Sequence, residues 1–335
     1  MLNGSRVLVA GASGYAGALA AALVQRHPDL ELAAVTSRSD AGRRLDDLYP
    51  YHRVALVLEE LDLERHGDVD AAIVAYPHGA AAPVVAALRD RDVVVVDLSA
   101  DFRLDDLGQY EQWYGTHAAP YLLEEAVYGL TELRRDEVRD ARLVANPGCY
   151  PTAVLLALAP LARAGLIADV VIDAKSGVSG AGRGPSEKTQ FVSADENVTP
   201  YGVGRHRHMP EIEEQLSALG ADGLVPAFTP HLLPLDQGEL VSCYVTTHGP
   251  ADRELVRDVF AEAYEDEPFV EVVGRPPGVR DVRDTNYCRI HALADERTGK
   301  VFVFAAIDNL WKGAASQAIQ NLNLMLGLSE TAGLL

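Results

Sequence analysis

The feature that most constrains the fold is a glycine-rich turn between an apolar run and a helical pattern near the start of the chain. The run Arg6–Ala10 is followed by GASGYAG (residues 11–17), which opens a helical pattern at Ala16–Arg26. Glycines there permit a tight bend and a close approach to a pyrophosphate, and the helix N-terminus supplies N–H groups. The spacing is G-x-x-G-x-x-G rather than G-x-G-x-x-G, and a purely structural turn is the alternative. We expect a dinucleotide at Gly11, Ser13, Gly14, Tyr15 and Gly17.

Further apolar runs in the first half of the chain predict more strands of the same sheet. They are continuous rather than alternating, which is typical of strands covered on both faces. A helical pattern such as Ala80–Arg89 between two runs completes a βαβ unit, so a parallel, Rossmann-type sheet is expected. The runs are Glu31–Thr36, Ala71–Ala75, Val93–Asp97 and Leu143–Ala145.

The pattern changes after a helix expected at Ala153–Ala164. Longer β-branched runs follow, and helices are fewer, with Pro210–Leu219 and Arg253–Tyr264 the clearest. This indicates an α+β domain with a mixed or antiparallel sheet, whereas the last helix, Lys312–Leu326, could return to the first domain. The expected strands are Val170–Ala174, Leu240–Thr247, Phe269–Val273, Tyr287–Leu293 and Val301–Ile307.

The end of the second expected strand indicates which dinucleotide is bound. An Asp or Glu at this position would suit the ribose 2′-hydroxyl of NAD. Here the strand ends in Thr36, Ser37 and Arg38, and hydroxyls with a guanidinium suit a 2′-phosphate, so NADP(H) is favoured. The alternative is that Arg38 is a solvated loop arginine. The nearby acidic residue Asp40 argues against binding of a 2′-phosphate.

Composition excludes several classes of protein. The 335 residues suffice for about two domains, and the formal net charge of −20 argues against nucleic acid and anionic membranes as partners. Three cysteines without a C-x-x-C pair argue against a disulfide framework or a zinc site. Neither a signal peptide nor a membrane span is evident. We therefore expect a soluble, cytoplasmic protein that meets anionic ligands with N–H groups and a few placed cations.

One of the three cysteines lies where a nucleophile is expected. Cys149, in NPGCYPT (146–152), joins the expected strand Leu143–Ala145 to a helix beginning near Pro151. A helix N-terminus stabilises a thiolate, and ligands bind at the carboxyl ends of parallel strands. Cys243 and Cys288 are flanked by strand residues and read as inert core thiols.

A thiol nucleophile needs a proton acceptor, and two histidines are candidates. His206 and His208 precede the helix introduced by Pro210, and we expect only one of them to face the sulfur because side chains at i and i+2 rarely point the same way. The Gly/Ser loop 175–183 follows an expected strand and can cradle a phosphate with its N–H groups, its hydroxyls and Arg183. An exposed basic cluster and a flexible loop are the alternatives.

Together these residues resemble the N-acetyl-γ-glutamyl-phosphate reductase family of the aspartate-semialdehyde dehydrogenase superfamily, and the match runs nearly end to end. NPGCYPT and HRHMPEI are the most specific motifs. The matching segments are GASGYAG (11–17), TSR (36–38), YPHG (76–79), DLSADFRL (97–104), YEQWYG (110–115), VYGL (127–130), NPGCYPT (146–152), KSGVSGAGR (175–183), HRHMPEI (206–212), TPHLLP (229–234) and DNLWKGA (308–314).

The resemblance implies a dinucleotide-binding domain (1–148 with 312–335) and a catalytic and dimerisation domain (149–311), in a homodimer or homotetramer. It implies reduction of an N-acetyl-γ-glutamyl phosphate by NADPH in arginine biosynthesis, through a cysteine thioester and without a metal. Cys149 would be the nucleophile, His208 the likelier base and His206 close to substrate. The remaining implied roles are phosphate binding by Ser179, Gly180 and Arg183, oxyanion binding near Asn146, and cofactor contacts at Pro77, Ser99 and Asn309.

The stretch after TPHLLP departs from the family, which often has Met and Arg followed by Gly-Ile. Here it reads Leu235-Asp-Gln237-Gly-Glu239, so a positive charge expected near Gln237 is missing. Three alternatives stay open: a reductase acting on an aminoadipyl or glutamyl phosphate carried by a small acidic protein, aspartate-semialdehyde dehydrogenase itself, and a catalytically silent NADP sensor. The group that reads the substrate α-carboxylate is also open, with Arg205 and Arg207 as candidates.

Overall fold

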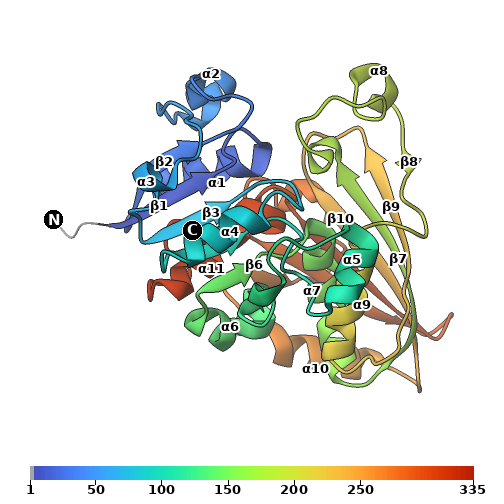
Figure 1. Cartoon of the computed structure of the whole chain (residues 1–335). Helices are drawn as coiled ribbons and strands as arrows, with labels where there is room; N and C mark the ends of the chain where they lie inside the picture. Colours follow the sequence, from blue (N-terminus) through green and yellow to red (C-terminus); the bar gives the residue numbers. More distant parts are fainter. Residues whose placement is uncertain (1–3) are drawn as a thin grey trace. The chain divides into compact units, whose positions relative to one another are not determined.

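The continuous apolar runs of the first half form a six-stranded parallel sheet in the order β2-β1-β3-β4-β6-β5 (Figure 1). The computed structural model describes residues 4–335. Residues in β1, β3, β4 and β6 are almost all buried, as continuous apolarity predicts. The strands are β1 (Ser5–Ala10), β2 (Leu30–Thr36), β3 (Ala71–Val74), β4 (Val94–Asp97), β5 (Ala126–Tyr128) and β6 (Leu143–Ala145).

This sheet belongs to unit 1, which comprises Met1–Gly148 and Ala314–Leu335. Helix α4 packs on one face, where its buried side chains join Leu8, Ala72 and Val95 in an apolar core. Helices α1 and α11 contact one another and pack on the strands. The helices and short turns of the unit are α1 (Tyr15–Arg26), α2 (Leu45–Leu48), η1 (Pro50–His52), α3 (Leu63–His66), α4 (Ala82–Arg89), α5 (Leu107–Tyr114), η2 (Pro120–Leu122), α6 (Thr131–Asp140) and α11 (Ser316–Met325).

The C-terminal helix is fixed in unit 1 by buried amides rather than by apolar contacts alone. The Asn321 amide donates to the Gly129 carbonyl oxygen at 2.8 Å and accepts from the Thr131 hydroxyl at 2.7 Å. Gln317 donates to the same hydroxyl at 3.0 Å. A π-helical turn, Trp311–Ala315, precedes α11, so the predicted helix Lys312–Leu326 begins later than expected.

Unit 2, Cys149–Gly313, contains a seven-stranded mixed sheet in the order β11-β12-β13-β10-β7-β9-β8. Strands β10, β12 and β13 pair antiparallel, while β7–β9 and β11–β12 are parallel pairs. Of the two sheet types expected from the sequence, the mixed one is confirmed. The strands are β7 (Ile167–Gly177), β8 (Thr199–Pro200), β9 (Ala227–Leu233), β10 (Glu239–Thr247), β11 (Val270–Val272), β12 (Cys288–Asp295) and β13 (Lys300–Ile307).

Helix α7 (Cys149–Arg163) is the central helix of unit 2, and it packs on β10 and β13. Its residues from Tyr150 to Ala162 are all buried. The helix begins at Cys149, earlier than the sequence suggested, because Pro151 lies in the first turn, where a missing N–H costs nothing. The other helices and turns are η3 (Val178–Ala181), α8 (Phe191–Ala194), α9 (Met209–Ala218), α10 (Arg253–Tyr264) and η4 (Val279–Asp281). Within residues 4–335, no helix is long and apolar enough to cross a membrane.

Candidate active site

Five of the sequence motifs lie at one edge of the sheet of unit 1. Because the strands are parallel, the segments that follow them gather at their common carboxyl edge, where open α/β sheets bind ligands. The order β2-β1-β3 puts the point at which the strand order reverses between β1 and β3. The motifs are GASGYAG after β1, TSR at the end of β2, YPHG after β3, DLSADFRL after β4 and, after β6, the first three residues (146–148) of NPGCYPT.

The glycine-rich turn leaves no room for side chains at two positions. A Cβ on Gly17 would lie 2.4 Å from the Gly11 carbonyl oxygen. Gly11 has φ +87°, and a Cβ on it would lie 2.6 Å from the Ala75 carbonyl oxygen. Gly14 is the N-cap of α1, so the first N–H groups of that helix face the turn. Backbone without side chains at a helix N-terminus can accommodate a pyrophosphate group. The residues present are therefore compatible with a bound dinucleotide.

The end of β2 carries hydroxyls and a guanidinium, as expected for a 2′-phosphate. The Ser37 and Ser13 hydroxyls lie 2.8 Å apart, and the Arg38 guanidinium lies 4.9 Å above the ring centre of Tyr76. Asp40, the acidic residue that argued against a 2′-phosphate, is buried and forms a 3.2 Å ion pair with Arg43. Its carboxylate is therefore engaged in its own loop.

Pro77 and Ser99 lie in two loops that are joined by one carboxylate. Asp101 accepts a hydrogen bond from the Gly79 N–H at 2.6 Å, which ties YPHG to DLSADFRL. The Ser99 hydroxyl donates to Asp97 at 2.6 Å. Burial raises the pKa of Asp97 to about 7 against these hydrogen bonds from Ser99. The loops expected beside the nicotinamide are thus rigidly connected to each other.

Asn146 is buried, and both ends of its amide are used within unit 1. It donates to the Ala314 carbonyl oxygen at 3.2 Å and accepts from Asn321 at 3.1 Å. Arg103 donates to its backbone carbonyl at 2.8 Å. This network holds the end of β6, from which the chain enters NPGCYPT.

Cys149 differs from the other two cysteines in exposure and in backbone setting. It is half-buried and is the first residue of α7, whereas Cys243 and Cys288 are 1% and 0% exposed and lie on strands. Burial raises the pKa of Cys243 to about 12, so that thiol stays protonated. The backbone of Gly313 lies against Cys149, since a Cβ on Gly313 would be 2.8 Å from the Cys149 Cβ.

The two histidines lie side by side before α9. Their ring centres are 4.8 Å apart, and the His208 N–H donates to His206 Nδ1 at 3.2 Å. Both rings contact the ring of Tyr150, at 5.6 and 5.9 Å between ring centres, so the two side chains converge on one residue. The chain turns here, with the Met209 N–H donating to the His206 carbonyl oxygen at 3.0 Å and His208 in the helical region, instead of running extended.

His206 is held neutral by its surroundings. Burial, and then the charge of Arg207, lowers its pKa to about 4. Its ring packs against Tyr201 and Phe228 at 5.4 Å from each ring centre. At neutral pH it therefore offers a nitrogen lone pair rather than a positive charge.

The Gly/Ser loop is pinned to the segment 235–238. The N–H groups of residues 177–179 donate to carbonyl oxygens of that segment at 2.8–3.1 Å, so these three do not face a phosphate as the sequence suggested. Asn309 joins the two stretches, because it donates to the Ser179 hydroxyl at 3.0 Å and accepts from the Gly238 N–H at 2.6 Å. Arg183 is exposed at the end of the loop.

Gln237 occupies the position where the family often has a positive charge. Its amide donates to Asp284 at 2.6 Å, and Arg283 lies 3.5 Å from the neighbouring Asp236 carboxylate. A guanidinium is therefore present beside this stretch, supplied by the segment before β12.

Sequence reasoning missed three polar residues beside the nucleophile. The hydroxyls of Tyr150 and Tyr201 lie 3.3 Å apart, and burial raises both pKa values. Glu239, at the start of β10, is 0% exposed and lies near Cys149, and within residues 4–335 neither of its carboxyl oxygens has a hydrogen-bond partner. The available signal was an acidic residue at an inward position of an apolar alternating strand.

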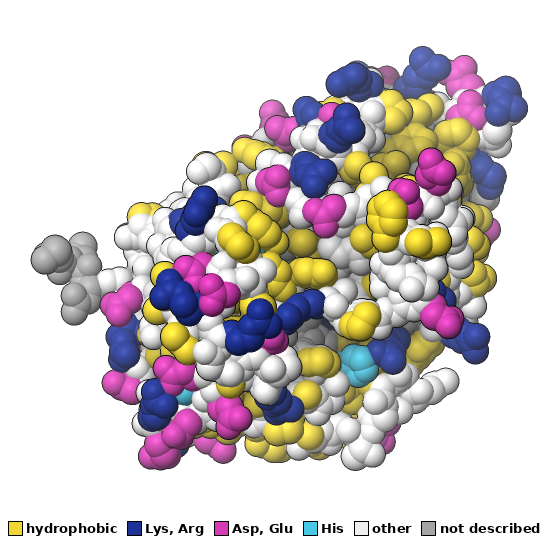
Figure 2. All heavy atoms as spheres, turned by 90° about the horizontal axis from the view of Figure 1, so that it is seen from above, with side chains coloured by type: hydrophobic (Ala, Val, Ile, Leu, Met, Phe, Trp, Pro, Cys, Tyr) yellow, Lys and Arg dark blue, Asp and Glu magenta, His cyan; other side chains and the backbone are white. Residues whose placement is uncertain are grey.

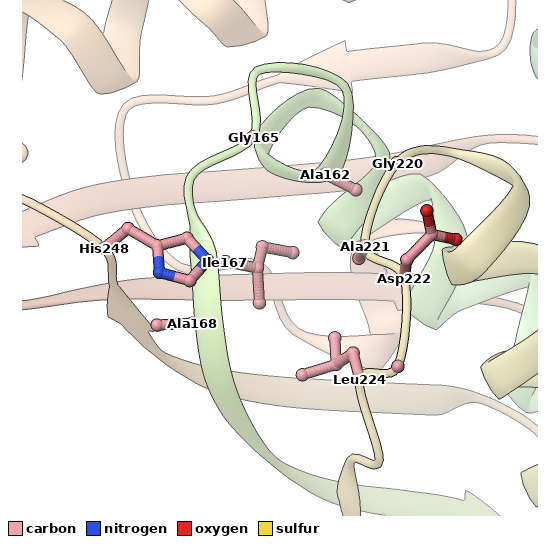
Figure 3. A pocket seen from close by; sticks show the side chains of 10 residues that line it. Ala162, Gly165, Ile167, Ala168, Gly220, Ala221, Asp222, Leu224 and His248 are labelled. Carbon is pink, nitrogen blue, oxygen red and sulfur yellow. The ribbon is translucent and has the colours of Figure 1, made fainter.

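The hollow shown in Figure 3 is not this site. It is lined by Ala162, Ile167, Leu224 and His248, at the opposite end of α7 from Cys149. A helix of 15 residues spans about 22 Å, which separates the two places. Its volume of about 150 Å³ is also well below the ~300–1,000 Å³ of typical ligand pockets.

Charges of both signs are mixed on the face that Figure 2 draws. Figure 2 shows Lys and Arg side chains interspersed with Asp and Glu over the visible face. Exposed side chains of the described residues also form ion pairs, such as Arg44–Asp46 at 2.8 Å and Arg142–Asp92 at 2.6 Å. That face offers no continuous basic field to a large acidic partner.

Comparisons with known proteins agree with the geometry. Two family descriptions match: "Semialdehyde dehydrogenase, NAD binding domain" over residues 6–141, and "Semialdehyde dehydrogenase, dimerisation domain" over residues 149–309. N-acetyl-gamma-glutamyl-phosphate reductase of Dehalococcoides mccartyi is 48% identical, covering 96% of this chain and 95% of the relative. The protein of that name from Desulforudis audaxviator is 49% identical, covering 98% and 97%.

Solved structures show the same fold. Aspartate semialdehyde dehydrogenase II of Vibrio cholerae, complexed with ASA, superposes with a TM-score of 0.74 at 18% identity, covering 97% of this chain and 99% of that one. Aspartate semialdehyde dehydrogenase with NADP from Candida albicans gives 0.70 at 16% identity, covering 97% and 99%. The chain therefore belongs to the N-acetyl-gamma-glutamyl-phosphate reductase family, an oxidoreductase branch of the semialdehyde dehydrogenases with a nicotinamide-dinucleotide-binding domain.

Proposed function

We propose that the protein reduces N-acetyl-γ-glutamyl phosphate to N-acetylglutamate 5-semialdehyde with NADPH, and releases phosphate, through a thioester on Cys149. The observation that carries this proposal is the half-buried Cys149 at the N-terminus of α7, in the same unit as the adjacent His206 and His208. The helix dipole favours the thiolate, which is the nucleophilic form of cysteine.

The cofactor would be held by unit 1. The bare backbone at Gly11 and Gly17 admits the pyrophosphate, and the N-terminus of α1 supplies N–H groups. Arg38 and Ser37 suit the 2′-phosphate of NADP(H). The other cofactor positions that we propose are Ser13, Gly14, Tyr15, Pro77 and Ser99 in unit 1, with Asn309 from unit 2.

The bonds formed and broken in the proposed thioester mechanism are accounted for without a metal ion. The Cys149 thiolate attacks the acyl carbon, the C–O bond to phosphate breaks, and phosphate leaves with the electron pair. When bound, NADPH supplies the hydride that reduces the thioester carbonyl. The resulting oxyanion collapses to the aldehyde and returns the thiolate, and N–H groups at the start of α7 suit that oxyanion.

The histidines would divide the acid–base work. His208 is the proposed general acid–base group, and its ring lies 5.9 Å from the ring of Tyr150, the neighbour of Cys149. His206, neutral because its pKa is lowered to about 4, would accept a hydrogen bond near the substrate. Each positioned group of this kind contributes roughly 10²–10⁴-fold.

The leaving phosphate would meet Ser179, Gly180 and Arg183. Asn309 fixes the Ser179 hydroxyl at 3.0 Å, which leaves its proton free to donate to a phosphate oxygen. Asn146, with its amide bonded within unit 1, would act by holding the strand end before the nucleophile rather than by touching substrate.

The proposed assembly is a homodimer or homotetramer in the cytoplasm. Unit 2 matches the dimerisation domain of the family. Side chains of its sheet that alternate with the α7-facing ones, such as Val171 and Tyr244, are partly exposed and suit a second copy of the chain.

The reverse reaction tests the substrate. With NADP and phosphate, NADPH formation is measured on N-acetylglutamate semialdehyde, aspartate semialdehyde and a semialdehyde linked to an acidic carrier protein. We expect kcat/KM to be highest for the first. A preference for either of the others would replace the proposed substrate, and a lack of phosphate-dependent oxidation with all three would contradict the enzyme function.

A further inference from the structure

The aromatic ring of Tyr76, the first residue of YPHG, contacts the arginine that suits the 2′-phosphate of NADP(H). The Arg38 guanidinium is 4.9 Å from the centre of this ring, a distance typical of a cation–π contact. Tyr76 follows β3 and Arg38 follows β2, so the contact joins the two strands that flank β1 in the sheet. Both residues belong to unit 1.

The ring of Tyr76 is held in place by the core and by the end of β2. The side chain is 8% exposed and belongs to the apolar core that α4 forms with the sheet. Its hydroxyl lies 3.5 Å from the hydroxyl of Thr36, the last residue of β2. Because β1 lies between β2 and β3, the tyrosine side chain reaches across the end of β1. The ring is therefore a fixed surface beside the glycine-rich turn.

Arg38, in contrast, is exposed and keeps its hydrogen-bond donors available. Within residues 4–335, no oxygen atom accepts a hydrogen bond from its guanidinium, and the acid nearest in sequence, Asp40, pairs with Arg43 instead. A ring face holds a cation without occupying its N–H groups, since the attraction comes from the ring quadrupole. The guanidinium can thus be positioned and still offer its N–H groups to a phosphate.

We propose that Tyr76 determines cofactor specificity, because its ring holds the Arg38 guanidinium where the 2′-phosphate of NADPH binds and so favours NADPH over NADH. The proposal rests on the proposed function in taking NADP(H) as the cofactor. Tyr76 acts through Arg38 and is a positioning residue. An arginine without such support loses more side-chain entropy when it engages the phosphate.

The competing role for the Tyr76 ring is a direct contact with the adenine of the cofactor. Adenine is common to NADPH and NADH, so loss of that contact weakens the binding of both alike. Loss of support for Arg38 weakens only the binding of the cofactor that carries a 2′-phosphate. The ratio of the two dissociation constants therefore separates the two roles.

Binding of NADPH and of NADH to the full chain, followed by nicotinamide fluorescence, tests the proposal without substrate. A cation–π contact contributes about 2- to 30-fold, depending on its exposure. Tyr76→Leu should raise the Kd for NADPH at least about threefold and the Kd for NADH less than about twofold. Tyr76→Phe keeps the ring and should keep the wild-type ratio. A wild-type ratio in Tyr76→Leu, or equal losses for both cofactors, would overturn the proposal.

A second substitution shows whether Tyr76 acts through the arginine. In an Arg38→Ala background, Tyr76→Leu should change the Kd for NADPH less than about twofold, because the group that the ring supports is already absent. Fully additive losses from the two substitutions would contradict the proposed role.

Tyr128→Leu is the matched control for loss of a buried ring in unit 1. Tyr128 is 5% exposed and ends β5, which lies at the opposite edge of the sheet from β2. This variant should keep the wild-type ratio of the two dissociation constants. A loss of NADPH preference equal to that of Tyr76→Leu would show general damage rather than a specific role.

If Tyr76→Leu does not fold, the electrostatics of the ring still decide. Phenylalanines with one, two or three ring fluorines at position 76 keep nearly the size of Phe but make the ring face less negative. The Kd for NADPH should rise with each fluorine while that for NADH stays constant, and a flat series for NADPH would overturn the proposal. Wild-type protein that binds NADPH no better than NADH would contradict the proposed cofactor itself, which distinguishes that failure from a failure of Tyr76 alone.

Discussion

At the residue scale, the surroundings of each cysteine decide what it can do. Cys243 lies in the row of buried side chains of β10, and its high pKa keeps it a thiol. Cys149 begins a helix and is reachable. That difference was predictable, because NPGCYPT joins a buried apolar run to a helical pattern. Glu239 was not predictable as a neighbour of Cys149, since 90 positions separate them and only the fold of unit 2 brings them together.

Replacing the nucleophile should abolish the reaction while leaving cofactor binding intact. Cys149→Ser exchanges a thiolate for a hydroxyl that stays protonated at neutral pH, so kcat should fall by at least about 10³-fold. The measurement is steady-state turnover, with NADPH binding followed by fluorescence as the control. Near-normal turnover would contradict the thioester scheme.

The cofactor choice depends on Arg38. A charge-assisted hydrogen bond to a phosphate contributes about 1.5–3 kcal/mol, so Arg38→Ala should raise the KM for NADPH about 10- to 100-fold. The KM for NADH, which lacks the 2′-phosphate, should barely change. Kinetics with both cofactors check this, and equal losses for the two would remove the assigned role of Arg38.

At the scale of elements, continuous apolar runs predicted the strands of unit 1 to within one residue, apart from β5. That strand, Ala126–Tyr128, has only three residues and no distinct run. Strand β9 was missed for a different reason: it contains Pro230, which cannot donate to a ladder. It pairs parallel with β7, and tertiary context overrides the local signal there.

The turn Trp311–Ala315 holds its backbone against the first residue of α7. Gly313→Ala would place a Cβ 2.8 Å from the Cys149 Cβ and 3.4 Å from the Asp308 carbonyl oxygen, so the cysteine must shift. Overpacking of this kind costs about 1–3 kcal/mol. We expect kcat to fall at least about tenfold with the KM for NADPH unchanged. Gly274→Ala, with nothing within 4 Å of its added Cβ, is the matched control and should behave as wild type. Normal turnover in Gly313→Ala would show that Cys149 tolerates displacement.

At the scale of the whole molecule, buried groups link stability to pH in two opposite directions. Asp97 and Glu239, with pKa values raised to about 7 and about 8, keep protons that the unfolded chain releases above about pH 4, so they stabilise less as pH rises. His52 and His206, with pKa values lowered to about 4, stay unprotonated in the folded protein, whereas the unfolded chain binds protons at these positions below about pH 6.5. They therefore stabilise the folded protein more as pH rises towards 6.5. Between about pH 4.5 and 6.5 the two effects oppose each other.

Above pH 6.5 only the carboxyls act, and the free energy of unfolding should decline. Each fully buried acid contributes about 1.4 kcal/mol per unit of pH up to its own pKa, so the loss between pH 6.5 and 8 is about 3 kcal/mol. Urea unfolding at a series of pH values measures it. Glu239→Gln removes the larger share and should flatten the curve in this interval, while Asp97 still accounts for the remaining loss below about pH 7. A wild-type curve that rises from pH 6.5 to 8 would show that neither acid keeps its proton in the folded protein.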